Sequence, residues 1–82
     1  DQETVNSKRI AERITFYREV ILPQAAQNAQ AALRAYQAQV ADFSQLMRAR
    51  QQELDSKLET LRLLVEGALV QVNLLYLSGD GV

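Results

Sequence analysis

The sequence predicts an all-α protein, an antiparallel two-helix coiled-coil hairpin that is expected to pack into a larger helical bundle or barrel. Strong helix formers dominate the chain, and no glycine occurs before Gly67. Apolar residues recur at steps of three and four in both halves of the sequence. A helix-start signal at Asp42 lies near the middle of the 82 residues, so the two halves can form arms of similar length.

The turn between the two helices is predicted from one capping signal. Asp42 is followed three residues later by Gln45, the spacing at which the two residues can each accept the other's backbone amide. The alternative is one unbroken helix with Asp42 solvated, because neither glycine nor proline marks the turn. The expected elements are a helix over about 4–39, a turn at about 39–42, a helix over about 43–77, and a tail at 78–82 that contains the glycine typical of a helix end.

Pro23 falls within the first predicted helix. Proline removes a backbone donor and clashes with the preceding turn, so a kink is expected near residues 19–23. The alternative is that Pro23 opens a new helix in its first turn, where proline is tolerated. The apolar period continues through Pro23, which favours the kink.

The apolar residues form more than one stripe on each arm. One stripe suffices for a pair of helices, so extra stripes predict neighbouring helices on two sides. In the second arm the apolar face widens from Leu61 onward. The expected stripes are Ile10, Ile14, Tyr17, Ile21, Gln24, Asn28, Ala31, Ala35 and Ala38, then Leu22, Ala26, Ala29, Leu33, Tyr36 and Val40, and in the second arm Phe43, Met47, Leu54, Leu58, Leu61, Val65, Ala68, Val72 and Leu75.

The composition argues against several classes of function. The chain has no histidine and no cysteine, so the commonest general base and the best nucleophile are missing, and its carboxylates are scattered. We therefore expect no enzyme, no cofactor and no metal site. The densest cationic group is Lys8, Arg9 and Arg13, with Glu12 among them, which predicts no nucleic-acid binding.

No segment is expected to span a membrane directly. The most apolar run, residues 61–77, still contains Arg62, Glu66, Gln71 and Asn73, whereas a spanning helix needs about 20 mostly apolar residues. Two helices alone also bury little surface, so the 82 residues are expected to be a fragment of a longer protein.

Three segments resemble the TolC family of outer-membrane efflux proteins, especially its heavy-metal branch of CusC and CzcC type. Residues 17–25, YREVILPQA, resemble a segment of the form Y-R-x-x-I-L-P-Q-A. Residues 36–50, YQAQVADFSQLMRAR, look like Y-x-x-G-x-x-D/S-F/Y-x-x-L-x-A-R/Q, and residues 74–79, LLYLSG, are similar to the end of the family's last long helix. The order and separation of these segments carry the resemblance over essentially the whole chain.

The resemblance implies the C-terminal helical hairpin of a trimeric channel in a tripartite efflux system. A β-barrel of such a channel lies in the outer membrane, and this segment would belong to the periplasmic α-helical barrel. Its tip would dock a periplasmic adaptor protein, with Tyr36 and Leu46 flanking the contact. The implied contact residues are Gln39, Val40, Ala41, Asp42 and Phe43.

The chain departs from the family pattern at the tip. Gln39 stands where the family usually has glycine, which reverses the chain with a positive φ at little cost. Either the turn differs, or the adaptor contact is altered, or the chain is a divergent member. The alternative function is a stand-alone helical module that self-associates, its stripes being covered between copies.

Overall fold

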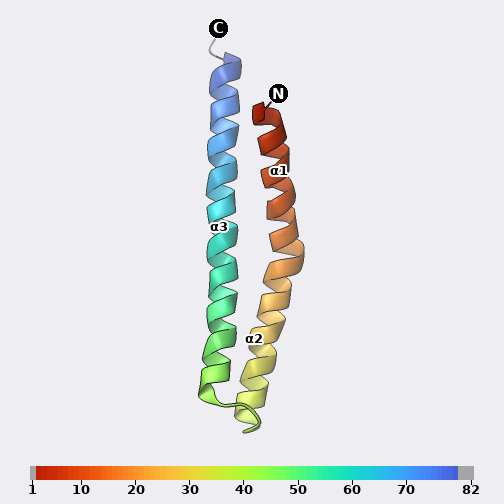
Figure 1. Ribbon diagram of the computed structural model, residues 1–82, viewed down its shortest axis with the longest axis vertical. Helices are drawn as coiled ribbons and strands as arrows, with labels where there is room; N and C mark the ends of the chain where they lie inside the picture. Colours follow the sequence, from red (N-terminus) through yellow and green to blue (C-terminus); the bar gives the residue numbers. More distant parts are fainter. Residues whose placement is uncertain (1, 80–82) are drawn as a thin grey trace.

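The computed structural model describes residues 2–79 and shows two antiparallel helical arms joined by a short turn (Figure 1). The hairpin measures 65 × 15 × 14 Å, and contacts run along both arms, so the alternative of one unbroken helix is wrong. The elements are α1 (Gln2–Phe16), a π-helical turn η1 (Tyr17–Ile21), α2 (Leu22–Gln37) and α3 (Phe43–Gly79).

The bounds differ from the expected ones at two helix ends. The first arm ends at Gln37 and not at 39, because the chain leaves the helical conformation at Ala38 and takes a positive φ at Gln39. The second arm begins at Phe43 as expected but continues to Gly79, so Ser78 and Gly79 belong to the helix rather than to a tail. The rest of the expected tail, 80–82, lies outside the described residues.

Pro23 follows a π-helical turn. The Leu22 amide donates to the Tyr17 carbonyl, five residues back, which admits one extra residue into the turn. Phe16 and Leu22, at the two ends of η1, keep right-handed helical dihedrals, so the arm stays helical throughout, and Pro23 lies in the first turn of α2. The irregularity lies where a kink was expected, and Figure 1 shows the first arm bowed there. The structure thus combines both expectations for Pro23, since the widened turn precedes a proline placed where its missing donor costs little.

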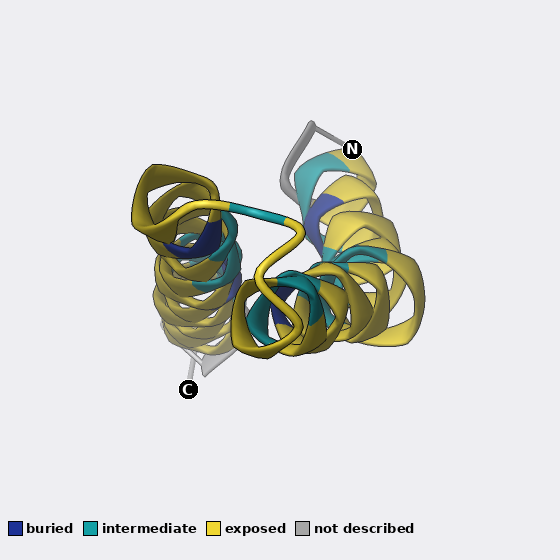
Figure 2. Ribbon diagram, turned by 90° about the horizontal axis from the view of Figure 1, so that it is seen from below, coloured by how far each residue is buried: buried dark blue, intermediate teal, exposed yellow. Residues whose placement is uncertain are grey.

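The two arms contact each other along one face of each, which we call the inner seam. On α3 these buried and half-buried positions follow steps of three and four without a break. Figure 2 shows the buried segments on the sides of the arms that face each other. The α3 inner seam comprises Leu46, Ala49, Glu53, Ser56, Thr60, Leu63, Gly67, Val70 and Leu74.

On the first arm the buried face shifts by one residue across η1. The face follows Ile10 and Ile14 in α1 and then Tyr17 and Ile21 at the two ends of η1. In α2 the buried and half-buried alanines are Ala25, Ala29, Ala32 and Ala35. The expected continuation of the first stripe is therefore wrong at Gln24, Asn28, Ala31 and Ala38, which are exposed, whereas Ala35 of the same stripe is half-buried. The extra residue of the π turn is the physical reason, because it rotates everything after it by about one helical position.

The leucine-rich stripe expected on the second arm faces away from the first arm. Leu61 is 56 % exposed, whereas Leu63 is 1 % exposed. Two residues differ by about 200° around an α-helix, so the two positions lie on nearly opposite faces. Within one chain, therefore, the inner seam of α3 is covered and the stripe is not. We call its regular part the outer seam: Leu54, Leu58, Leu61, Val65, Ala68, Val72 and Leu75.

Small and polar side chains on the inner seam allow the arms to approach closely. A Cβ atom added to Gly67 would lie 3.3 Å from Ile10 Cγ2 and 3.3 Å from Ile14 Cδ1. The Thr60 hydroxyl is buried but satisfied, because it donates to the Ser56 carbonyl at 2.8 Å. The α3 helix thus accepts polar residues in its buried face without leaving an unpaired group.

We predict that Gly67→Leu lowers the free energy of unfolding by about 1–3 kcal/mol, because the added side chain must displace Ile10 and Ile14. Gly67→Ala should change it by less than about 1 kcal/mol, since the gain in helix propensity offsets the tight contact. Urea unfolding followed by circular dichroism at fixed chain concentration measures both. Ala26→Leu, which enlarges an exposed residue of α2, is the matched control. Equal stability of Gly67→Leu and the parent chain would contradict the close approach.

Candidate functional site

The tip of the hairpin begins with a closed helix end. The Gln39 amide donates to the Tyr36 carbonyl at 3.0 Å, and the Val40 amide donates to the Ala35 carbonyl at 2.8 Å. These two bonds form a Schellman motif, in which the residue after the C-cap takes a left-handed conformation. Gln39 is that residue, with φ 61°. Of the three explanations for the absent glycine, an altered turn conformation is not needed, because Gln39 itself adopts the positive φ.

The second half of the tip is the capping box predicted from the sequence. The Gln45 amide donates to Asp42 Oδ1 at 2.9 Å, and the Asp42 amide donates to Gln45 Oε1 at 2.9 Å. These bonds pair two backbone donors at the start of α3 that the helix itself cannot satisfy. The prediction of the cap is confirmed, and Asp42 therefore has a structural role at the start of α3, with one of its two carboxylate oxygens bonded to the Gln45 amide.

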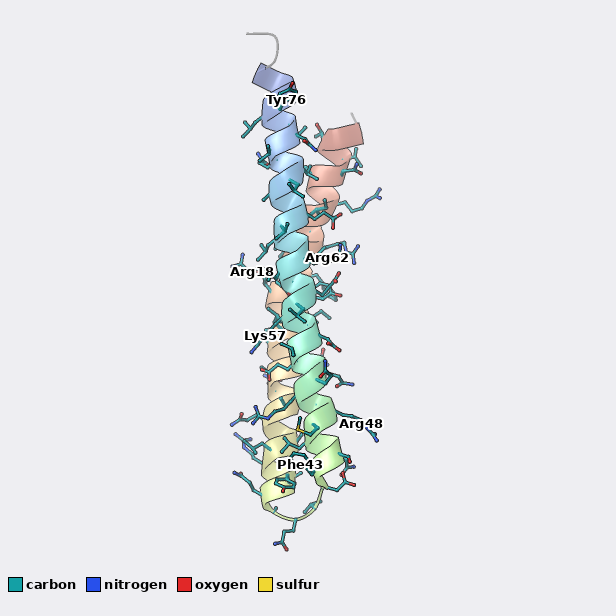
Figure 3. The ribbon with its side chains drawn as sticks, turned by 90° about the vertical axis from the view of Figure 1, so that its left-hand side faces the viewer. Arg18, Phe43, Arg48, Lys57, Arg62 and Tyr76 are labelled. Atoms are coloured by element: carbon teal, nitrogen blue, oxygen red, sulfur yellow. The ribbon has the colours of Figure 1, made fainter. Side chains whose placement is uncertain are left out.

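The remaining tip residues present apolar surface at the end of the rod. Val40 is 81 % exposed and Phe43 is 58 % exposed. The Phe43 ring meets the Tyr36 ring edge-on, with centroids 5.8 Å apart, so one side of Phe43 is held by the opposite arm. Figure 3 shows Phe43 close to the turn. The structure therefore brings Val40, Phe43 and Tyr36 to one end of the molecule.

Two of the implied tip positions are less accessible than the resemblance suggests. Ala41 is half-buried, and Leu46, expected to flank the contact, is 6 % exposed because it belongs to the inner seam. The rest of the turn and the two aromatic residues are thus more accessible at this end than Ala41 and Leu46.

The outer seam of α3 forms a second exposed surface. An open groove of about 500 Å³ lies along it, lined by Leu58, Leu61, Val65 and Leu69 and flanked by Arg62 and Glu66. This surface was expected to be part of a packed stripe, and in the single chain nothing covers it. Contiguous apolar surface of this kind marks an interaction site in soluble proteins.

Charges beside the outer seam are paired within α3. Arg62 donates to Glu59 through two nitrogens, at 2.6 and 2.9 Å, and to Glu66 Oε2 at 2.8 Å. The hydrogen bonds from Arg62 lower the pKa of the Glu59 carboxyl, and the same pairing raises the pKa of the Arg62 guanidinium. Arg62 is therefore held as a cation between two carboxylates.

Neither a cluster of potential metal ligands nor a helix suited to crossing a membrane occurs among the described residues. Over residues 2–79, no group of acidic side chains converges as a metal site would require. None of the helices in that range combines the length and apolarity needed to cross a bilayer. Comparisons of the chain with protein-family models, with characterised proteins and with solved structures find no match.

The position of the turn could be predicted from the sequence, but the inner seam of α3 was missed. The missed positions include Glu53, Ser56, Thr60 and Gly67, none of which is a large apolar residue. The signal that could have found them is their spacing, because they continue the steps of three and four that connect Leu46 with Leu63 and Leu74.

We predict that Gln39→Gly raises the free energy of unfolding by about 0.5–1 kcal/mol. A left-handed conformation costs an L-residue about 1–2 kcal/mol, and part of that gain is lost to the greater freedom of glycine in the unfolded chain. Thermal and urea unfolding measure the change. Gln37→Gly, two residues earlier and inside α2, should instead destabilise by about 1 kcal/mol. A loss of stability in both variants would rule out relief of strain at position 39.

We predict that Asp42→Ala lowers the free energy of unfolding by about 1 kcal/mol, because the amide at the start of α3 loses its acceptor. Gln45→Ala should cost less, and the double variant should cost less than the sum, since the two bonds support each other. Urea unfolding of the three variants gives the coupling. Ser44→Ala, in the same helical turn but outside the capping box, is the control. Strictly additive losses would show that the two residues act independently.

Proposed function

We propose that the chain is a periplasmic hairpin of a TolC-type outer-membrane efflux channel and contributes both channel wall and adaptor-docking tip. The observation that carries the proposal is the free outer seam on α3, which runs along a straight arm whose other face is already packed. A helix with apolar residues on opposite faces belongs between neighbours, as in the wall of a helical barrel. The resemblance of residues 17–25 and 36–50 to the family supplies the identity of that barrel.

The first arm supports a wall with one water-facing side. Residues 24–32 contain no charged side chain and consist of alanine, glutamine and asparagine. Gln24, Gln27, Asn28 and Gln30 are all exposed in the hairpin. Uncharged amides bind water without imposing a field of one sign, which suits a surface past which solutes of either charge must move.

Adaptor docking is assigned to the apolar tip. Val40 lies in the turn and Phe43 is the first residue of α3; both are exposed, and the side chain of neither is needed to satisfy a backbone group. Gln39 adds a polar side chain beside them, whereas Asp42 acts as the cap of α3. The proposed partner is therefore a helical adaptor that offers an apolar contact.

A stand-alone helical module is the second candidate, and the uncovered outer seam favours it equally. The two functions differ in what surrounds the segment in its gene. A parent reading frame with an upstream signal peptide and strand-rich segments supports the channel. A start codon immediately before Asp1, with no such segments, supports the module and contradicts the channel.

We predict that Val40→Asp weakens binding of the hairpin to the periplasmic adaptor of the parent efflux system by tenfold or more. A buried apolar anchor is worth more than about 1 kcal/mol at an interface, and a desolvated carboxylate adds a further penalty. Titration calorimetry with purified adaptor measures the affinity, and efflux by cells expressing the full-length parent measures the consequence.

The control for this experiment is Val5→Asp, which introduces the same charge at an exposed valine in the other end of the hairpin. Circular dichroism should be the same for both variants, since neither side chain belongs to the inner seam. Charge reversal at Asp42 is a poorer probe, because it also removes the cap of α3. Unchanged adaptor affinity in Val40→Asp would contradict docking through the tip.

A further inference from the structure

The outer seam of α3 has the regularity of a coiled-coil interface. Its members follow steps of four and three without interruption for three heptads. The six larger ones range from 49 % exposed at Leu54 to 65 % exposed at Leu75, so the seam is free from end to end. Leu69 and Tyr76, which border it, are also largely exposed. The apolar residues of this surface are therefore not scattered, because they are spaced as the residues of a helix that packs against a second helix.

The exposed area is close to what a stable complex requires. From their exposed fractions, the large seam residues together with Leu69 and Tyr76 present roughly 800 Å² of mainly apolar surface. That is about the area that one partner contributes to an interface of standard size. Two copies of the hairpin meeting through this face would therefore bury enough surface for specific association.

The side chains on the seam favour two parallel strands. Written as heptads, Leu58, Val65 and Val72 occupy the a positions, and the d positions are Leu54, Leu61, Ala68 and Leu75. Valine at a with leucine at d is the pattern that favours parallel two-stranded coiled coils. In register, each member of the seam would meet its own counterpart, so apolar residues face each other in every layer from Leu54 to Leu75, with alanine on both helices at position 68.

Charges at the edges of the seam are compatible with that pairing. In a parallel pair the g residue of one strand faces the next e residue of the other, so Arg50 faces Asp55 of the second copy. Asp55 accepts one bond from Gln51 at 2.9 Å and keeps acceptor capacity for Arg50. Lys57 would face Arg62, but Arg62 is paired with two carboxylates of its own helix, which reduces the repulsion.

We propose that the outer seam binds a second copy of this chain in a parallel, in-register two-stranded coiled coil, with both tips at the same end. A second copy supplies all the complementary layers at once. A lipid surface fits less well, because Asp55, Glu59 and Glu66 lie on the same helix beside the seam and would oppose an anionic bilayer. The inference concerns the 82-residue chain in solution and does not rest on the channel proposal.

Sedimentation equilibrium of the chain tests the association. A species of twice the 9.2 kDa chain mass is expected. Leu61→Lys, in the centre of the seam, should raise the dimer dissociation constant more than tenfold while leaving the helical circular dichroism spectrum of the hairpin in place. Asn73→Lys, an exposed position of α3 outside the seam, should leave it unchanged. A monomer at all concentrations, or a larger assembly, overturns the proposal, and so does equal weakening by both lysines.

Single cysteines test the orientation, since the chain has none of its own. Leu61→Cys should form a disulfide-linked dimer in a glutathione redox buffer, because parallel in-register strands place the two sulfur atoms together. Ala31→Cys, exposed on α2, should remain unlinked. An antiparallel pair with Leu61 opposite Val72 would instead link a mixture of Leu61→Cys and Val72→Cys chains and leave Leu61→Cys alone unlinked, which would overturn the parallel arrangement. A negative result in the sedimentation or the cysteine experiment would not affect the proposal of docking through the tip, which Val40→Asp tests separately.

Discussion

Two helices can cover only one face of each other, and this constraint governs the rest of the hairpin. The α3 arm has apolar residues on two opposite faces, but the partner arm can reach just one of them. The face that it covers is the one rich in small residues, with Gly67 against Ile10 and Ile14. The leucines on the opposite face of α3 stay exposed, because the first arm cannot reach both faces of the same helix.

The close contact between the arms also explains why polar residues occur in the buried face. Where the backbones approach closely, as at Gly67, a large side chain has little room, so small residues occur on this face beside Leu46, Leu63 and Leu74. Thr60 remains satisfied within its own helix, and Ser56 donates to the Gln52 carbonyl at 3.0 Å in the same manner. The core between the two arms is thin, so much of the apolar surface of the hairpin stays exposed. Burying that surface against neighbouring molecules would add stability.

Much of the hairpin could be predicted from local chemistry, and the rest required knowledge of how the arms meet. The cap at Asp42 and Gln45 was predictable because two side chains at a fixed spacing suffice to form it. The resemblance to a family with glycine at this position indicated that a left-handed conformation could occur at residue 39. Glutamine by itself favours a negative φ, so the residue type alone did not predict it. The inner seam of α3 was not predictable from hydrophobicity, because the larger leucines of the outer seam carry the stronger signal. The register beyond Ile21 was missed because one extra residue in a turn leaves no mark in composition.

The π turn at Tyr17–Ile21 has a consequence for how the length of the first arm can change. Before it, the buried face runs through Ile10 and Ile14; after it, the same face continues through Ala25 and Ala29. Removing one residue from η1 would restore the heptad spacing between Tyr17 and Ala25, with both halves of the arm still directed at α3. Loss of one residue anywhere else in the arm would turn one half by about 100° relative to the other. Single-residue deletions should therefore be tolerated between Tyr17 and Ile21 and selected against on either side, so that this turn is where related sequences can differ in length.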